Sequence, residues 1–261
     1  MNAWLALTKK EFRLGLPAFL VALVLFAGII TGGYYLGNHL GYQNELIMTA
    51  LAMVVMLHLF FLTFYLYYSL NAERKRLHLW LHNPMSIGGL LISKMFTGIV
   101  FMAITFITSL ILAVMFFKNH FGIFNEQTTF NILGLSTVSI FISSLSIAVT
   151  FIFFWSIFLT YNQRMNDFLS FMVTFILFLL LAFFYEKFTH LAFMETLTNW
   201  GAIQIKDVIM GFELSFMEDA FEAETMSETS IFYIGHFLRD FVVAVFMFIA
   251  ACWIIDKKVE V

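Results

Sequence analysis

Six long apolar runs divide the sequence, and short polar stretches separate them. Each run holds about 20 to 30 residues, which is enough for a helix to cross the ~30 Å hydrocarbon core of a bilayer. The pattern therefore predicts an all-α, polytopic membrane protein with six transmembrane helices in one domain, residues 1–261. The expected spans are Leu14–Leu36, Ile47–Leu70, Met95–Phe117, Asn131–Thr160, Phe168–Tyr185 and Ile231–Ile255.

The segment before the first span, residues 1–13, has an apolar and a basic side. Trp4, Leu5 and Leu7 precede the basic pair at Lys9 and Lys10. This arrangement predicts an interfacial N-terminal helix, with its apolar groups in the bilayer surface and its basic groups among anionic headgroups.

The longest polar interruption in the first half of the chain is residues 71–94. Within it, Leu77, Trp80 and Leu81 recur at i, i+3 and i+4, and the pattern ends at Pro84. The spacing predicts a short amphipathic helix between the second and third spans. Because this helix is too short to cross a bilayer, its apolar face must be buried against headgroups or against another protein.

A second unusual stretch, residues 186–230, precedes the last span and carries nine acids and two lysines. Leu191, Met194 and Leu197 follow helical spacing, and so do the apolar residues from Ile205 to Phe216. We expect one or two helices here that dip into the outer leaflet or cover the mouth of the bundle. A solvated lid without contact to substrate is the alternative.

Lysines and arginines gather on one side of the predicted spans. Ten of the 14 lie in the N-terminal segment, the second and fourth loops and the C-terminal tail, and four lie on the opposite side. The positive-inside rule therefore places both termini and residues 71–94 in the cytoplasm. We expect a multi-pass protein of a bacterial cell membrane.

Composition supports the membrane class and removes several kinds of chemistry. The chain is 61% hydrophobic and 12% charged, which is more apolar than a soluble domain of this size needs. Its single cysteine, Cys252, excludes a disulfide framework, and no Cys or His cluster has metal-ligand spacing. The motifs GxxxxGK[ST], HExxH and GxSxG are missing, so we expect no catalytic residues, no metal site and no cofactor in this chain.

Two sets of polar residues inside the predicted spans are candidates for a substrate path. His58 lies in the middle of the second span, where an ionisable group is a functional candidate, and a neutral packing histidine is the alternative. In the fourth span, hydroxyl residues recur at spacings of 3, 4, 3 and 4 and share one seam, which favours helix packing over a polar lining. These residues are Ser136, Ser139, Ser143, Ser146 and Thr150.

A third candidate group lies near the outer end of the last span. His236, Arg239 and Asp240 occur at i, i+3 and i+4 and therefore share a helix face. Arg239 is expected to pair with Asp240 or with the acidic stretch 186–230, which we call the outer segment. A structural latch at the outer rim is the favoured role, and a gate is the alternative.

Two local patterns add a family resemblance. The opening WLALTKKEF, Trp4–Phe12, has apolar residues followed by a basic dipeptide and a glutamate. The stretch ERKRLHLWLHNPMSIGGLLISK, Glu73–Lys94, has a charged helix, a Pro-x-Ser step at Pro84 and Ser86, and a Ser-Lys pair that opens the third span. Together with the six-span layout, these patterns resemble the membrane subunits of ABC-2 type ABC exporters.

The resemblance implies a permease subunit that exports an amphipathic peptide, an antibiotic or a lipid-like molecule. ATP and Mg would bind to a separate cytoplasmic ATPase subunit, present in two copies, and a second permease subunit would complete a homodimer or heterodimer in the lipid. No nucleic-acid partner is implied. By position, the helix that couples to the ATPase is Glu73–Leu81. The residues expected at the contact are Glu73, Arg74, Arg76, Leu77, Trp80, Leu81 and Pro84.

Two alternatives remain open at this point. A non-transporting accessory or immunity protein would bind a toxic peptide at the acidic outer segment. An integral-membrane enzyme would need a polar cluster at one depth, for which the sequence offers only His58 and the serine seam of the fourth span.

Overall fold

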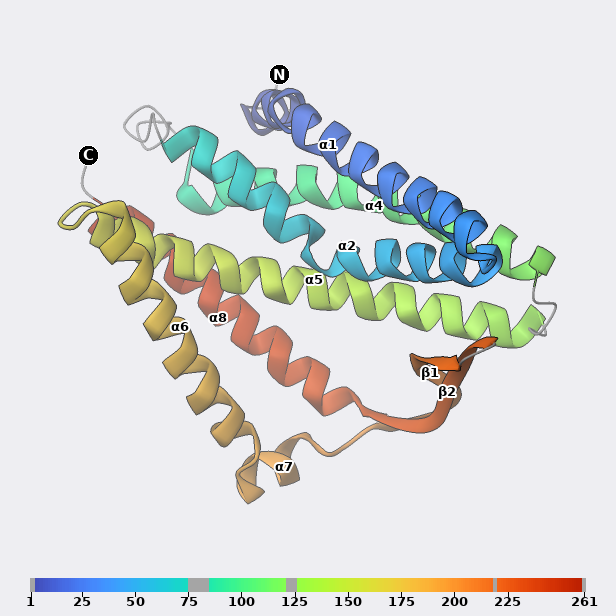
Figure 1. Cartoon of the computed structure of the whole chain (residues 1–261). Coiled ribbons are helices and arrows are strands. Elements are labelled where there is room, and N and C mark those ends of the chain that lie inside the picture. The colour runs from blue at the N-terminus through green and yellow to red at the C-terminus, as the bar shows by residue number, and fades with distance from the viewer. Residues whose placement is uncertain (1–2, 75–84, 121–125, 218–219, 260–261) are drawn as a thin grey trace. The chain divides into compact units, whose positions relative to one another are not determined.

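A computed structural model describes residues 3–74, 85–120, 126–217 and 220–259 (Figure 1). Six of its helices are long and apolar enough to cross a membrane. The elements in chain order are α1 (Ala3–Leu40), α2 (Gln43–Arg74), α4 (Ile87–His120), α5 (Glu126–Asn162), α6 (Asp167–Thr189), α7 (Ala192–Thr198), β1 (Ala202–Met217), β2 (Ala220–Tyr233) and α8 (Ile234–Lys258).

The six predicted spans are confirmed as long apolar helices, but several helix ends differ from the prediction. Helix α1 begins at Ala3 rather than Leu14, and α5 begins at Glu126 rather than Asn131. An apolar run marks the part of a helix that suits lipid, and the helical hydrogen bonds extend into the residues that precede it. Residues 3–13 are thus the first turns of α1, and their place at the membrane surface stays a prediction.

Helix α1 has a proline in its interior, Pro17. Proline has no N–H to donate to the preceding turn, and its ring crowds the carbonyl four residues earlier, so helices bend at such sites. Figure 1 shows the first turns of α1, next to the N-terminus, running in a different direction from the rest of the helix.

The chain divides into two compact units, and the boundaries between them fall inside α2, α4, α5, β1 and β2. Each unit therefore combines parts of several helices. The first unit is Met1–Ser69, Ser93–Ser144 and Lys206–Thr229, and the second is Leu70–Ile92, Leu145–Ile205 and Ser230–Val261.

In the first unit, α2 buries one face. Val54 and Leu62 lie fully out of solvent on either side of His58, at a spacing that returns to the same side of the helix. Phe106 of α4 is buried too, and its ring meets the rings of His58 and of Phe141 on α5. In this unit, α2 and α4 thus share a core built around His58.

In the second unit, α5 and α8 supply much of the buried apolar surface. Ile152 and Leu159 of α5 are buried, as are Ala251 and Ile255 of α8. The spacing of four residues between the two α8 positions puts them on one face of that helix.

The long helices differ in how much of their apolar surface the chain itself covers. The most apolar stretches of α1, α6 and α8 are 11% buried, whereas those of α2, α4 and α5 are 33% to 44% buried. Apolar helices this exposed need lipid or another protein chain against them.

Glycines of α1 fall into two groups. A Cβ atom on Gly33 would lie 2.8 Å from the Cβ of Ala50, and one on Gly37 would lie 2.7 Å from the Cα of Gln43, so both glycines allow close approach to α2. A Cβ atom on Gly28 or Gly32 would meet no described atom within 4 Å. The first pair is therefore used for packing inside the unit, and the second pair is not.

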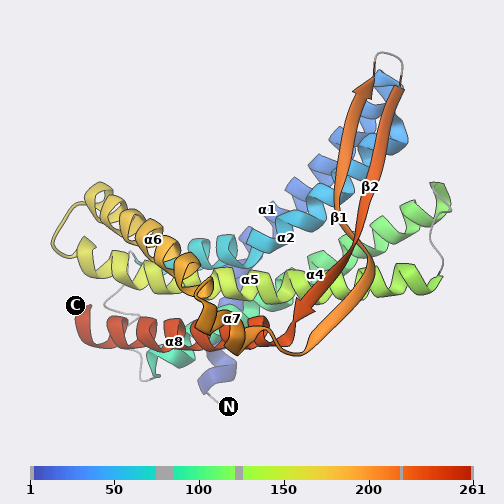
Figure 2. The same cartoon turned by 90° about the horizontal axis from the view of Figure 1, so that it is seen from below.

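The outer segment differs from its sequence prediction. Helix α7 accounts for the predicted helical spacing around Met194, but the predicted helix from Ile205 to Phe216 is wrong, because β1 and β2 form a two-stranded sheet there. Figure 2 shows the two strands side by side. Isoleucine, valine and phenylalanine favour strands, and acids alternate with other residues in β2, as at Glu222 and Glu224.

The predicted coupling helix falls mostly outside the described residues. Helix α2 continues to Arg74, residues 75–84 are not described, and α4 begins at Ile87. The Ser86 hydroxyl accepts a hydrogen bond from the N–H of Gly89 at 3.3 Å and so caps the start of α4. The serine of the Pro-x-Ser step thus has a local structural role.

Candidate functional site

A buried polar cluster joins α1, α2 and α4 in the first unit. Lys94 of α4 donates to the Oε2 atom of Glu11 on α1 at 2.8 Å and to the hydroxyl of Ser69 on α2 at 2.8 Å. The Ser69 hydroxyl lies 3.4 Å from the same carboxylate oxygen. All three residues are 0% exposed. We call Glu11, Ser69 and Lys94 the buried triad.

Aromatic packing brings Glu11 to this position. The ring of Trp4 lies 5.7 Å from that of Phe96, and the ring of Phe12 lies 5.4 Å from that of Phe101. Both contacts join the first turns of α1 to α4, on either side of Glu11 in the sequence. Offset and edge-to-face ring pairs of this kind add to the apolar area that they bury.

The charges of the buried triad are stable out of water only while Glu11 and Lys94 stay paired. A charged group taken out of water is strongly disfavoured unless an opposite charge and hydrogen bonds replace the lost hydration. Lys94 supplies the opposite charge to the Oε2 atom of Glu11, and Ser69 adds a hydroxyl between them. The Oε1 atom of Glu11 is buried without a hydrogen-bond partner among the described residues. The buried triad therefore ties α1, α2 and α4 together.

Sequence reasoning missed the buried triad as a site. It assigned Glu11 to the surface helix, counted Lys94 among the cytoplasmic charges and took it as the start of the third span. One signal was present, because Glu11 is the first acid in the chain and Lys94 stands at the head of a long apolar run. An acid and a base that enter apolar helices need each other as partners.

A second polar cluster lies in the second unit and includes the predicted coupling residue Arg74. Arg74 donates to the Oδ1 atom of Asp167, the first residue of α6, and its guanidinium lies 5.0 Å from the ring centre of Phe158 on α5. With its amide oriented to suit both neighbours, Asn162 donates to Asp167 at 2.7 Å and accepts from Arg74 at 3.0 Å. The end of α2 is thus tied to the end of α5 and the start of α6.

The other predicted coupling residues are placed only in part. Glu73 lies in the last turn of α2 and is buried, so its side chain does not form an open docking surface. The remaining predicted contacts lie outside the described residues and stay predictions. They are Arg76, Leu77, Trp80, Leu81 and Pro84.

His58 is packed among apolar rings. Its side chain is 0% exposed, and its ring lies 4.8 Å from that of Phe26 and 5.0 Å from that of Phe106. The Nδ1 atom lies 2.8 Å from the carbonyl oxygen of Val54, and Nε2 lies 3.1 Å from the hydroxyl of Thr105. A carbonyl only accepts, so Nδ1 donates to Val54. This arrangement favours the packing interpretation.

The predicted hydroxyl seam of the fourth span is only half covered by the chain. Ser139 is exposed, Ser143, Ser146 and Thr150 are half-buried, and the side chain of Ser136 lies outside the described part. The fully buried serine of this region is Ser144, whose hydroxyl lies 3.5 Å from the Sδ atom of Met102.

Thr150 of the seam has a contact to another helix. Its hydroxyl donates to the carbonyl of Ser146 at 2.9 Å and lies 3.8 Å from the Sδ atom of Met247 on α8. Back-bonding to the preceding turn satisfies the hydroxyl without any partner on another helix. The contact to α8 is consistent with a packing seam, and the choice between packing and a polar path stays a prediction.

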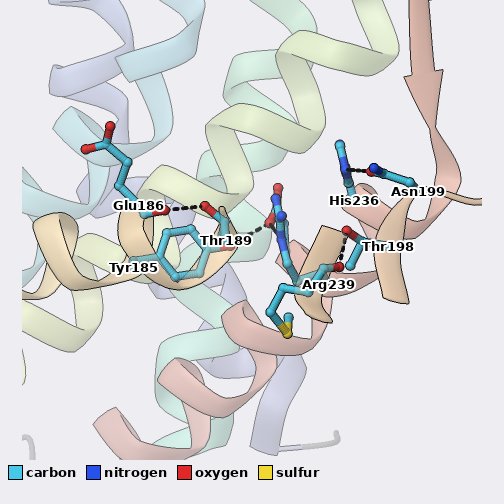
Figure 3. Close-up of polar contacts among 9 residues, drawn as sticks. Tyr185, Glu186, Thr189, Thr198, Asn199, His236 and Arg239 are labelled. Carbon is cyan, nitrogen blue, oxygen red and sulfur yellow. Dashed lines mark hydrogen bonds and ion pairs between the residues drawn. The ribbon is translucent and has the colours of Figure 1, made fainter. Parts of the chain in front are cut away.

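The outer-rim residues form contacts between α6, α7 and α8, all within the second unit (Figure 3). Arg239 donates from Nε to Oδ1 of Asp240 at 2.8 Å, and the Tyr185 hydroxyl donates to the same oxygen at 2.6 Å. The Arg239 guanidinium also lies 5.8 Å from the centre of the Tyr185 ring. Of the two partners expected for Arg239, the structure thus shows Asp240, while Tyr185 was not foreseen.

Helix α7 is held to α8 by a second set of rim contacts. The Nε2 atom of His236 lies 2.9 Å from Oδ1 of Asn199, as Figure 3 shows. A Cβ atom on Gly235 would collide with the carbonyl group of Thr198, so glycine permits the close approach of α8 to the end of α7. The polar groups of this rim bond one another, which suits a structural latch.

The described residues offer no metal centre, because no three His, Cys, Asp or Glu side chains among them lie together in a way that would hold an ion. No protein-family model, curated protein or solved structure matches the chain.

Proposed function

We propose that this chain is the transmembrane permease subunit of an ABC-2 type ABC exporter. The observation that carries the proposal is a short basic segment that starts at Arg74, where α2 ends, and stands between two apolar helices long enough to cross a membrane. Trp80 in this segment is a residue type that commonly anchors protein contacts, and Leu81 is a further apolar residue next to it in the sequence. Since the chain has no phosphate-binding loop, ATP hydrolysis belongs to a separate subunit.

The proposed mechanism passes motion from that subunit into the membrane. Two ATPase subunits bind ATP and Mg, and their closure pushes on the coupling helix Glu73–Leu81. The push rocks α1, α2 and α4 against a second permease subunit, identical or related. The exposed apolar surface of α1 supports a need for such a neighbour or for lipid.

The proposed substrate is an amphipathic peptide, an antibiotic or a lipid-like molecule. Aromatic residues make up 19% of the chain, and such side chains suit apolar or amphipathic ligands. The outer segment 186–230 has nine acids against two lysines, and a surface of one sign raises the local concentration of cationic molecules. A cationic amphipathic peptide fits both features.

The enzyme alternative gains no support from the site. It needs His58 to reach a substrate, but His58 is fully buried and stacked among phenylalanine rings. A general acid or base must lie within hydrogen-bond reach of the group on which it acts. The accessory or immunity alternative is separated from the permease by the presence of a bound ATPase.

Purification from the native host in mild detergent, followed by mass spectrometry, tests the proposal. We expect a stoichiometric soluble partner that carries a GxxxxGK[ST] motif and hydrolyses ATP. If the chain is recovered alone at every salt concentration, without ATPase activity, the permease proposal is wrong and the accessory protein takes its place.

A further inference from the structure

The buried triad lies close in sequence to both ends of the segment that the proposed function assigns to the ATPase. Ser69 is near the end of α2, which finishes at Arg74, and Lys94 is near the start of α4, which begins at Ile87. Glu11 belongs to the first turns of α1. One carboxylate thus bonds to both helices that flank residues 75–84.

Packing around the triad makes the attachment of α1 close as well as polar. A Cβ atom on Gly15 would lie 2.6 Å from the Tyr65 ring and 2.8 Å from the Phe101 ring, so α1 touches α2 and α4 at this point. The Phe19 ring stacks on the Phe101 ring at 4.8 Å. Close-packed interiors transmit displacement, because they have little empty volume to absorb it.

We propose that Glu11, Ser69 and Lys94 are positioning residues that lock the first turns of α1 to the two helices flanking residues 75–84. When the ATPase displaces that segment, the lock makes α1 move with α2 and α4. This inference rests on the proposed function and adds to it the residues that pass the motion on. Separation of the triad would leave two unpaired charges out of water, so the parts of α1, α2 and α4 that belong to the first unit stay together.

The test uses the full complex of permease and ATPase in vesicles of phosphatidylethanolamine and phosphatidylglycerol. The variants are Glu11→Gln, Lys94→Met, the charge exchange Glu11→Lys with Lys94→Glu, and Ser69→Ala, which keeps both charges. Lys9→Met and Arg13→Gln are matched controls, because both residues are exposed charges on the same turns of α1. Two quantities are measured: the amount of ATPase bound, and the ratio of the ATP hydrolysis rate in the complex to that of the ATPase subunit alone.

We expect each single charge variant to bind the ATPase normally while its rate ratio falls about fivefold or more. The charge exchange restores most of the ratio, Ser69→Ala lowers it less than the charge variants do, and the two controls keep the wild-type ratio. A purely structural role would instead lower the amount of bound ATPase in step with the amount of folded permease.

Three outcomes overturn the inference. The first is a wild-type ratio in both single charge variants, and the second is a loss that the exposed-charge controls share. The third applies if the single charge variants do not fold: the inference then depends on Ser69→Ala, and an unchanged ratio in that variant overturns it. Failure of the proposed function has a different signature, because the wild-type chain would then bind no ATPase at all.

Discussion

The ammonium of Lys94 lies 2.8 Å from a carboxylate oxygen of Glu11, and neither residue reaches solvent. The two residues are far apart in the sequence and belong to different long helices, α1 and α4. A buried pair of this kind is costly to break from one side, because the remaining charge has no substitute for water.

Removal of either charge should therefore destabilise the chain. We expect Glu11→Gln and Lys94→Met each to lower the free energy of unfolding by about 3 to 5 kcal/mol. Thermal unfolding in detergent, followed by size-exclusion chromatography, measures the effect. The double variant Glu11→Gln with Lys94→Met should be more stable than the sum of the two losses predicts. Losses that simply add would show that the pair does not interact.

The second prediction concerns His58. An apolar side chain of similar size should replace it, because its surroundings are phenylalanine rings and only one of its two hydrogen bonds, to Thr105 on α4, reaches another helix. We expect His58→Leu to cost about 1 to 2 kcal/mol and to keep transport, whereas His58→Asp should fail to fold because it buries an unpaired charge. The unfolding temperature and a transport assay on the same preparation provide the check. A folded His58→Leu protein without transport would assign a functional role to this histidine.

The third prediction separates the two pairs of glycines in α1. Gly33→Val should cost about 1 to 3 kcal/mol, because the added methyl groups meet α2 at the contact with Ala50. Gly28→Val is the matched control, since the space around Gly28 is open among the described residues. Unfolding temperatures of the two variants, measured in the same detergent, should therefore differ. Equal losses would contradict the close approach of α1 and α2.

The fourth prediction concerns the outer rim. The Tyr185 hydroxyl donates to Asp240, so Tyr185→Phe should lower the free energy of unfolding by about 1 kcal/mol. The same substitution in an Asp240→Ala background should cost almost nothing, because its partner is already gone. A double-mutant cycle on thermal unfolding measures the difference. An equal cost in both backgrounds would place the Tyr185 contribution outside this hydrogen bond.

The spans were predictable because a membrane helix needs a long apolar run, and the sequence shows each run directly. The helix ends were less predictable. Residues 3–13 look like a separate surface helix by composition, yet they continue into α1 without interruption. Composition reports the surroundings of a residue, whereas backbone hydrogen bonds decide where a helix ends.

The buried triad and the strands were not predicted, for two different reasons. Glu11 and Lys94 become partners only through the packing of α1 on α4, which no local pattern reveals. Around Val208 and Phe212, apolar residues fit helical spacing and strand preference at once, and the structure has a strand there. For His58, the sequence suggested both a functional role and a packing role, and its burial among aromatic rings favours the packing role.

The proposal of an exporter subunit is tested most directly by the ATPase that stays bound when Trp80 and Leu81 are both changed to aspartate. We expect the variant to reach the membrane folded but to lose the bound ATPase and ATP-dependent transport, because charged groups replace the apolar anchors of the contact. Phe193→Asp with Leu197→Asp is the matched control, since these exposed residues of α7 lie far along the chain from the coupling segment. If the Trp80 and Leu81 variant keeps its full complement of ATPase and its transport, the coupling segment and the function built on it are wrong.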